Sequence, residues 1–187
     1  MISLNQLQNS GNTCIFIRHG EKNLNGYDLS SEGKKQSLEF AEKLYLLNKE
    51  INVFSSPEQR CIETATIINN RINGESSNIS LSSALGKPGI QVKNEIEYTK
   101  LTDTMRCRDI FSEWKRGKCC EAMHRPEIVK ERVISFFEKT SFKNDGITLY
   151  ISQSGTVACT GYALNLTDYK NVDHEWVDYL DGYIFRL

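Results

Sequence analysis

A histidine and an arginine stand together directly after a short apolar run, where a strand is expected to end. The run Ile15–Ile17 is followed by Arg18, His19, Gly20 and Glu21. An imidazole held at a strand end can present one ring nitrogen as a nucleophile, and a neighbouring guanidinium binds the oxygens of an anion in a forked geometry. These residue types suit attack on phosphorus, because the arginine offsets phosphoryl charge. For the tripeptide alone, a surface histidine beside an arginine in a turn is the favoured interpretation.

A second arginine follows another expected strand end. The sequence predicts a strand over Ile51–Ser55 and a helix over Pro57–Asn70, with Ser56 as N-cap and Pro57 at the first helical position. Arg60 then lies in the first turn of this helix. Because ligands of such sheets bind beyond the carboxyl ends of the strands, Arg60 is expected to share a crevice with the first arginine. Two guanidiniums around one dianion would position it and balance its charge.

Strands and helices are predicted to alternate along the chain. We expect further strands over Thr13–Arg18, Ile147–Ser152 and, at a sheet edge, Gly182–Leu187, and further helices over Ser31–Asn48, Pro126–Phe142 and Gly155–Asn165. This order is typical of a three-layer α/β/α sandwich with a mostly parallel sheet covered by helices on both faces. The length of 187 residues predicts a single domain, 1–187. Residues 83–125 show no clear period and are interpreted as an insertion over one end of the sheet.

Three blocks of sequence resemble the histidine phosphatase superfamily, which includes the cofactor-dependent phosphoglycerate mutases. The blocks are Arg18–Gly20, Asp28–Gln36 and Ser55–Ala65, and the resemblance resumes at Ile147–Leu166. Their order and spacing agree with the family pattern, and three blocks together are far more specific than one. The resemblance implies a phosphoglycerate mutase-like fold and phosphoester chemistry. It implies no cofactor, and no metal is expected because two arginines can supply the charge that a metal would otherwise provide.

The resemblance also implies a role for individual residues. His19 would be the residue that becomes phosphorylated, while Arg18 and Arg60 would bind the phosphoryl oxygens. Asn25 lies six residues after the histidine, where mutase-like members carry an asparagine that contacts phosphate. Glu21 is placed at the rim of the site.

The sequence departs from the family pattern at the end of its third expected strand. The family reads Ser-His-x-Gly there, whereas this chain reads Ser152, Gln153, Ser154, Gly155. Gln153 therefore stands where the second histidine of the family donates a hydrogen bond to the phosphoryl group. Its amide still donates but is never cationic, and losing a charged donor typically costs about 10²–10³ in rate. A natural substitution and an introduced one both remain open as its origin.

The proton donor is not settled by the sequence. The branch related to acid phosphatases carries an aspartate after the second histidine, where this chain has Ser154, a rim residue. Mutase-like members take their acid from a glutamate after the second strand, and Glu95 and Glu97 lie in about that region. The remaining candidate acids are Glu21, Asp103 and Glu113. His124 or His174 could replace the missing histidine, although a surface or packing role is favoured for both.

The amino-acid composition limits the kinds of partner that the chain is expected to bind. The chain has 23 Lys and Arg against 24 Asp and Glu, so it lacks the charge of a nucleic-acid binder and offers no polybasic face to a membrane. No apolar stretch approaches the roughly 20 residues of a membrane span, and no secretory signal is evident. The six cysteines are therefore expected as reduced thiols in a cytoplasm. Cys119 and Cys120 near His124 are a less favoured candidate metal or redox site.

Together these observations favour a phosphohydrolase that removes phosphate from a small phosphoester through a phosphohistidine at His19, impaired by Gln153. A sugar phosphate or a nucleotide would suit a basic lid over residues 83–125, although a solvated mixed-charge surface is the favoured interpretation. The cations concerned are Lys100, Arg106, Arg108, Lys115, Arg116, Lys118 and Arg125. The alternatives are a catalytically inactive phospho-ligand binding module and an interaction protein with a vestigial cleft. The oligomeric state stays open.

Overall fold

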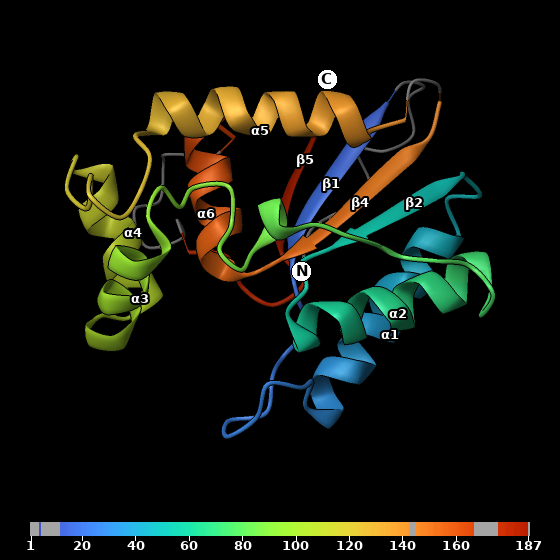
Figure 1. Cartoon of the computed structure of the whole chain (residues 1–187). Helices are drawn as coiled ribbons and strands as arrows, with labels where there is room; N and C mark the ends of the chain where they lie inside the picture. Colours follow the sequence, from blue (N-terminus) through green and yellow to red (C-terminus); the bar gives the residue numbers. More distant parts are fainter. Residues whose placement is uncertain (1–3, 5–11, 143–144, 167–175, 187) are drawn as a thin grey trace.

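A central sheet carries the strand ends at which the candidate residues lie. The computed structural model describes residues 4, 12–142, 145–166 and 176–186 (Figure 1). Within them the sheet has five strands in the order β3–β2–β4–β1–β5. The strands are β1 (Thr13–Arg18), β2 (Ile51–Ser55), β3 (Ser80–Leu81), β4 (Ile147–Ser152) and β5 (Gly182–Arg186). All neighbours pair in parallel except β1 and β5, which confirms a mostly parallel sheet with an antiparallel edge strand.

Helices cover both faces of this sheet. They are α1 (Ser31–Tyr45), α2 (Gln59–Asn73), α3 (Glu95–Thr104), α4 (Cys107–Lys115), α5 (Pro126–Thr140) and α6 (Ser154–Ala163). Figure 1 shows α1 and α2 on one side and α5 and α6 on the other. Side chains of β1 alternate accordingly, since Ile15 and Ile17 join the core beneath α1 and α2, while Phe16 joins the opposite core. The three-layer α/β/α sandwich is confirmed.

Each layer is fixed by fully buried side chains. Phe40 and Leu44 of α1 have no exposed surface, and burying such a side chain contributes about 1.5–3 kcal/mol. On the opposite face the ring of Phe137 lies 5.7 Å from that of Phe16 and 4.6 Å from that of Tyr150, measured between centroids. Tight packing on both faces holds the strands, and hence their ends, in one arrangement.

Helix α2 begins later than the sequence predicted. The backbone N–H of Ser56 donates to the carbonyl of Ile151 at 2.9 Å, which continues the pairing of β2 with β4 beyond the strand. The chain therefore needs Pro57 and Glu58 to turn before the helix can start, and the N-cap is Glu58 instead of Ser56. Arg60 still lies in the first turn.

Other helix ends differ by a few residues. Helix α1 ends at Tyr45, three residues before the expected end at Asn48, whose positive φ of 49° does not continue a helix. Helix α5 ends at Thr140 because Ser141 is extended. Helix α6 covers Ser154–Ala163 instead of 155–165, and the predicted last strand residue, Leu187, lies outside the described residues.

Residues 83–125 contain two helices that were not predicted. Helix α4 buries Ile110, Phe111 and Trp114, whereas α3 buries none of its residues. Both helices lie beside α6 (Figure 1), and a short 3₁₀ helix, Ser83–Leu85, precedes them. The Leu85 carbonyl accepts a hydrogen bond from the hydroxyl of Ser152, the last residue of β4. This segment therefore borders the carboxyl end of β4.

Candidate active site

His19 is held at the junction of two parallel strands. Its backbone N–H donates to the carbonyl of Ser152 at 3.0 Å, and the next N–H, of Gly20, donates to the hydroxyl of Thr64 on α2 at 3.1 Å. Position 20 has no space for a side chain, because a Cβ there would lie 2.7 Å from the Gly33 carbonyl oxygen. The His19 side chain is 3% exposed, so its orientation is fixed by packing on all sides.

The imidazole of His19 is arranged as a nucleophile. Its Nδ1 lies 2.6 Å from the carbonyl oxygen of Gly20, which can only accept, so Nδ1 carries the proton and Nε2 carries the lone pair. Burial, together with the positive charges of Arg60 and Arg18, lowers the pKa of His19 to about 3, against the opposing effect of the Gly20 hydrogen bond. At neutral pH the ring is therefore uncharged and its Nε2 is free of a proton.

Arg18 is fixed by the segment that precedes β5. Its Nη1 donates to the carbonyl of Val177 at 2.9 Å, and its guanidinium carbon lies 3.9 Å from the ring centroid of Tyr179. The Nε–H of Arg18 is buried and has no hydrogen-bond acceptor among the described residues. Such a donor is costly to leave unsatisfied, so it is suited to an oxygen of a bound anion. The Tyr179 ring also lies 5.9 Å from the His19 ring.

Arg60 links His19 to a carboxylate. Its Nε donates to Nε2 of His19 at 3.0 Å, and its Nη1 lies 3.4 Å from an oxygen of Glu58. The carboxylate of Glu58 therefore already balances positive charge on Arg60. Neither Glu58 nor Tyr179 was predicted, since the first is a variable position of its block and the second lies in a segment with no chemical pattern.

Gln153 occupies the strand end next to His19. In the pairing of β1 with β4, Arg18 faces Ser152, so the following residues, His19 and Gln153, are neighbours. Gln153 is the N-cap of α6 and lines a cavity of about 390 Å³. A Cβ on Gly86 would lie 3.0 Å from Nε2 of Gln153, so a glycine at position 86 permits this close approach. The other residues lining the cavity include Glu58, Lys87, Gln91, Glu95, Tyr98, Cys107 and Thr156.

The remaining candidates are only partly gathered at this site. Glu95 lines the cavity with Gln153, whereas Glu97 pairs with Lys100 at 2.7 Å and is not among the residues lining it. Ser154 opens helix α6 beside Gln153. Asn25 is exposed in the loop after β1, on a separate hollow of the surface.

Two other charged candidates have structural partners. The carboxylate of Glu21 accepts a hydrogen bond from the Ser30 hydroxyl at 2.8 Å, which ties the end of β1 to the N-cap of α1. Glu113 pairs with Arg116 and Lys118 on the surface. Asp103 lies on the exposed part of α3.

Of the two candidate replacement histidines, His124 does not join the site. The backbone of His124 bonds to Gln91 and Trp114, and burial, Arg132 and Lys93 lower the pKa of its side chain. His124 is absent from the lining of the cavity beside Gln153. His174 lies outside the described residues. All six cysteines are free, and no group of three or more His, Cys, Asp or Glu side chains in the described ranges is arranged to hold a metal ion.

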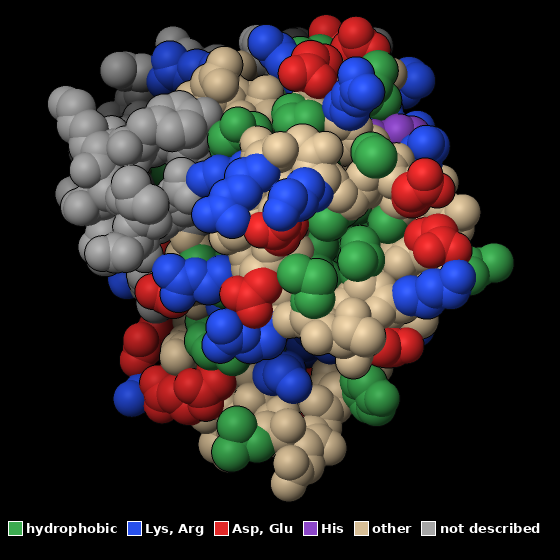
Figure 2. All heavy atoms as spheres, turned by 90° about the vertical axis from the view of Figure 1, so that its left-hand side faces the viewer, with side chains coloured by type: hydrophobic (Ala, Val, Ile, Leu, Met, Phe, Trp, Pro, Cys, Tyr) green, Lys and Arg blue, Asp and Glu red, His purple; other side chains and the backbone are tan. Residues whose placement is uncertain are grey.

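The cations of residues 83–125 largely pair with nearby acids. Arg106, the N-cap residue of α4, bonds to Asp109, and Lys100 bonds to Glu97 within α3. Figure 2 shows basic and acidic side chains interspersed on this face of the molecule. This arrangement favours the mixed-charge surface over a lid dedicated to an anionic substrate.

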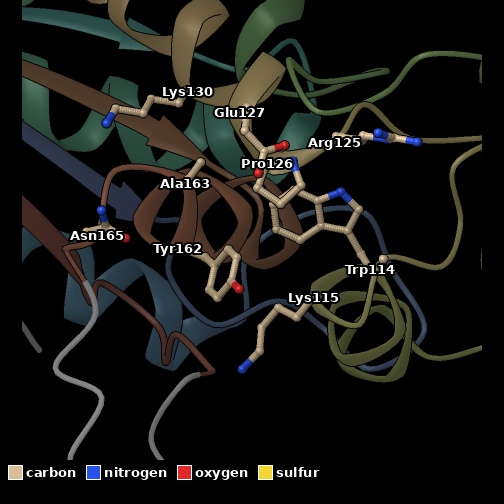
Figure 3. Close-up of a pocket in the computed structure, with 10 residues that line it drawn as sticks. Trp114, Lys115, Arg125, Pro126, Glu127, Lys130, Tyr162, Ala163 and Asn165 are labelled. Carbon is tan, nitrogen blue, oxygen red and sulfur yellow. The ribbon is translucent and has the colours of Figure 1, made fainter.

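A larger cavity, of about 680 Å³, lies away from the histidine. It is formed by the end of α4, the start of α5 and the end of α6, and neither His19, Arg18 nor Arg60 lines it. In Figure 3, Lys115, Arg125 and Lys130 extend in different directions around it and do not converge on one point. The smaller cavity is not lined by these three residues either, but it is lined by Gln153 and Glu58, which neighbour His19 and Arg60. It is therefore the cavity that borders the candidate active site.

The match to known families decides the identity. Residues 14–174 match the model of the histidine phosphatase superfamily, branch 1. The chain belongs to the histidine phosphatase superfamily. No curated protein matched this histidine phosphatase in sequence. No helix in its described residues is long and apolar enough to cross a membrane.

Solved structures share the fold of this histidine phosphatase at low sequence identity. Phosphoglycerate mutase from Bacillus anthracis str. Sterne superposes with a TM-score of 0.59 at 14% identity, over 95% of this chain and 89% of the mutase. A mycobacterial glucosyl-3-phosphoglycerate phosphatase gives 0.54 at 17% identity, over 83% and 80% of the two chains. A protein described as mycobacterial hydrolase 2 gives 0.56 at 16% identity, over 83% and 73%. These likenesses establish the phosphoglycerate mutase-like fold.

Proposed function

We propose that this chain is a phosphomonoesterase that transfers phosphate from a small phosphoester to His19 and then to water. One observation carries the proposal. The unprotonated Nε2 of a neutral His19 faces the Nε–H of Arg60 at 3.0 Å, beside the buried and unsatisfied Nε–H of Arg18. Membership of the superfamily supports phosphoester hydrolysis in general.

In this proposal the phosphoryl group enters between the two arginines. Its oxygens take the hydrogen bond that Arg60 now gives to His19, together with the unused Nε–H of Arg18. The lone pair of His19 is then free to attack phosphorus, and two guanidiniums stabilise the charge that develops. The exposed loop after β1 would add the amide of Asn25 as a further contact. No metal or other cofactor is invoked, because the arginines supply the positive charge.

We propose that Gln153 performs, less effectively, the task of the second histidine of the family. Its place beside His19 in the sheet register supports this role. A neutral amide donates a hydrogen bond but adds no charge, so the chemical step should be slower by about 10²–10³ than with a charged donor.

The cavity beside Gln153 is proposed to take the alcohol portion of the substrate. Its volume of about 390 Å³ suits a small phosphorylated molecule, such as a sugar phosphate or a nucleotide. One structural neighbour, the mycobacterial phosphatase, is described in complex with inorganic phosphate, which agrees with phosphate as the shared ligand. Six free cysteines favour a reducing compartment, and we propose the cytoplasm.

The second candidate function is a catalytically inactive module that binds phosphorylated ligands. Gln153 favours it, because the arginines can bind phosphate without a charged donor for turnover. The two candidates differ in whether a phosphohistidine forms, not in whether phosphate binds.

Turnover of 4-nitrophenyl phosphate separates the two candidates. We expect slow release of phosphate by the chain and release about 10²–10³ faster by Gln153→His, with His19→Asn inactive in both backgrounds. Calorimetry with inorganic phosphate serves as the matched binding measurement. Phosphate binding without turnover, even after Gln153→His, would contradict the enzyme and support the binding module.

A further inference from the structure

Glu58 is the N-cap residue of α2, yet its side chain does not cap the helix. Its carboxylate accepts no hydrogen bond from the backbone N–H groups of the first turn of α2. The carboxylate instead lies 3.4 Å from Nη1 of Arg60, and only 18% of the side-chain surface is exposed. A largely buried carboxylate paired with a side chain that contacts the candidate nucleophile is a candidate for chemistry.

One guanidinium group joins this carboxylate to the nucleophile. Arg60 contacts Nε2 of His19 through Nε and contacts Glu58 through Nη1. Glu58 also lines the cavity beside Gln153, into which the alcohol portion of an ester would extend. Glu58 therefore borders both the phosphoryl position and the leaving-group position.

The other candidate acids are less well placed. Glu95 lines the same cavity but is exposed on α3 and makes no described contact with His19 or Arg60. Glu97 is engaged by Lys100, and Glu21 is engaged by the start of α1. Only Glu58 combines contact with Arg60 and access to the cavity.

We propose that Glu58 is the proton donor to the leaving group, an inference that rests on the proposed function. In the structure its carboxylate is the counter-ion of Arg60. A bound phosphoryl group takes over the guanidinium, so the Glu58 carboxyl is released from Arg60 and can carry a proton beside the leaving-group oxygen. The ester itself or the solvent supplies this proton.

Transfer of this proton from Glu58 and back to it completes both steps of the reaction. In the first step Nε2 of His19 bonds to phosphorus, the bond from phosphorus to the ester oxygen breaks, and the proton of Glu58 passes to that oxygen, which leaves as an alcohol. In the second step a water oxygen bonds to phosphorus and the bond to His19 breaks. The proton of that water returns to Glu58, and inorganic phosphate is released.

The dependence of rate on leaving group tests this role. Phenyl phosphate has a poor leaving group that needs the proton, whereas 4-nitrophenyl phosphate has a good one that does not. We expect Glu58→Gln to lower kcat/KM for phenyl phosphate by about 10²–10³ and for 4-nitrophenyl phosphate by less than about tenfold. Glu97→Gln, at a carboxylate that pairs with Lys100 and does not line the cavity, is the matched control and should affect both esters little. Glu95→Gln, at the other carboxylate that lines the cavity, tests the competing proton donor. All variants are measured in the Gln153→His chain as well as in the original chain.

Each outcome bears on one of the two claims. An equal loss on both esters, or the selective loss appearing in Glu95→Gln instead, would overturn the role of Glu58 while leaving the phosphatase intact. Absence of turnover in every background would contradict the proposed function, and this inference with it. Should Glu58→Gln unfold, Glu58→Asp retains an acid and should keep the preference between the esters near that of the parent. A selective loss on phenyl phosphate as large as that expected of Glu58→Gln would then overturn the proposal.

Discussion

At the scale of single residues, burial and charge act on His19 in the same direction. Removal from water and two neighbouring guanidiniums all disfavour the imidazolium, so the pKa of His19 falls to about 3. The imidazole is then uncharged throughout the physiological range. The bond from Nδ1–H to the Gly20 carbonyl fixes which ring nitrogen carries the lone pair.

The lowered pKa of His19 should make the protein sensitive to acid. Between the unfolded value of 6.5 and the folded value of about 3 the unfolded chain binds more protons. Stability is therefore complete above pH 6.5 and decreases as the pH falls toward 3. By about pH 4.5 this amounts to about 2–3 kcal/mol. Urea unfolding should show that His19→Asn removes this loss, while His124→Asn, a more exposed histidine, retains most of it. Equal acid sensitivity in both variants would contradict this explanation.

Arg60 should contribute strongly to phosphate affinity. A charge-assisted hydrogen bond contributes about 1.5–3 kcal/mol, so Arg60→Ala should weaken binding of inorganic phosphate by about 10–100-fold. Isothermal calorimetry measures this change directly. Arg71→Ala is the matched control, because Arg71 pairs with Glu42 on the outer surface of α1 and α2. Unchanged affinity in Arg60→Ala would show that this arginine does not face the ligand.

The sequence predicted the central residues of the candidate site, but not the residues that contact and position them. Arg18, His19 and Arg60 follow strand ends in recognisable blocks, and the structure places Arg60 against His19. Tyr179 and Glu58 depend on how a distant segment and a helix start are placed in three dimensions. No local pattern in the sequence encodes those contacts.

At the scale of elements, the start of α1 is packed directly against the chain that leaves β1. A Cβ at Gly33 would lie 2.0 Å from the Glu21 carbonyl oxygen, which is backbone and cannot rotate away. This close approach supports the turn that carries Gly20, and hence His19. The close packing at Gly33 therefore helps to position His19.

The substitution Gly33→Ala should force the start of α1 away from the chain that leaves β1. Because the backbone must shift, we expect a loss of about 1–3 kcal/mol in the free energy of unfolding, with a lower rate of turnover. Gly155→Ala is the control, since its nearest neighbour would be the Tyr98 hydroxyl at 3.7 Å and the position is helical. That variant should be as stable as the parent or slightly more so. Chemical denaturation of the two variants tests this; a Gly33→Ala protein of parental stability would contradict it.

The elements that escaped prediction did so for identifiable reasons. Helix α3 buries no residue, so it has no apolar period, and its remaining signal was Asn94, which caps it through bonds to the N–H groups of Ile96 and Glu97. Helix α4 is short, and its three buried residues, Ile110, Phe111 and Trp114, span little more than one turn. The longer helices were predicted because their apolar faces extend over several turns.

At the scale of the whole molecule, the α/β/α layers bring distant parts of the chain to one edge of the sheet. Helices α1 and α2 cover one face of the sheet and α5 and α6 the other (Figure 1), and the carboxyl ends of β1, β2 and β4 meet at this edge. The first carries Arg18 and His19, the second leads into the helix of Arg60, and the third ends beside Gln153. The alternation of strands and helices along the sequence was sufficient to predict this convergence.

Trapping of the phosphorylated protein tests the central claim most directly. The chain and its Gln153→His variant would be mixed with a radiolabelled phosphoester, quenched in alkaline denaturant and mapped by mass spectrometry. Our account predicts a label that is stable in base, labile in acid and located on His19, with none in His19→Asn. A label on a different residue, or none in either protein while a control histidine phosphatase is labelled, would contradict it.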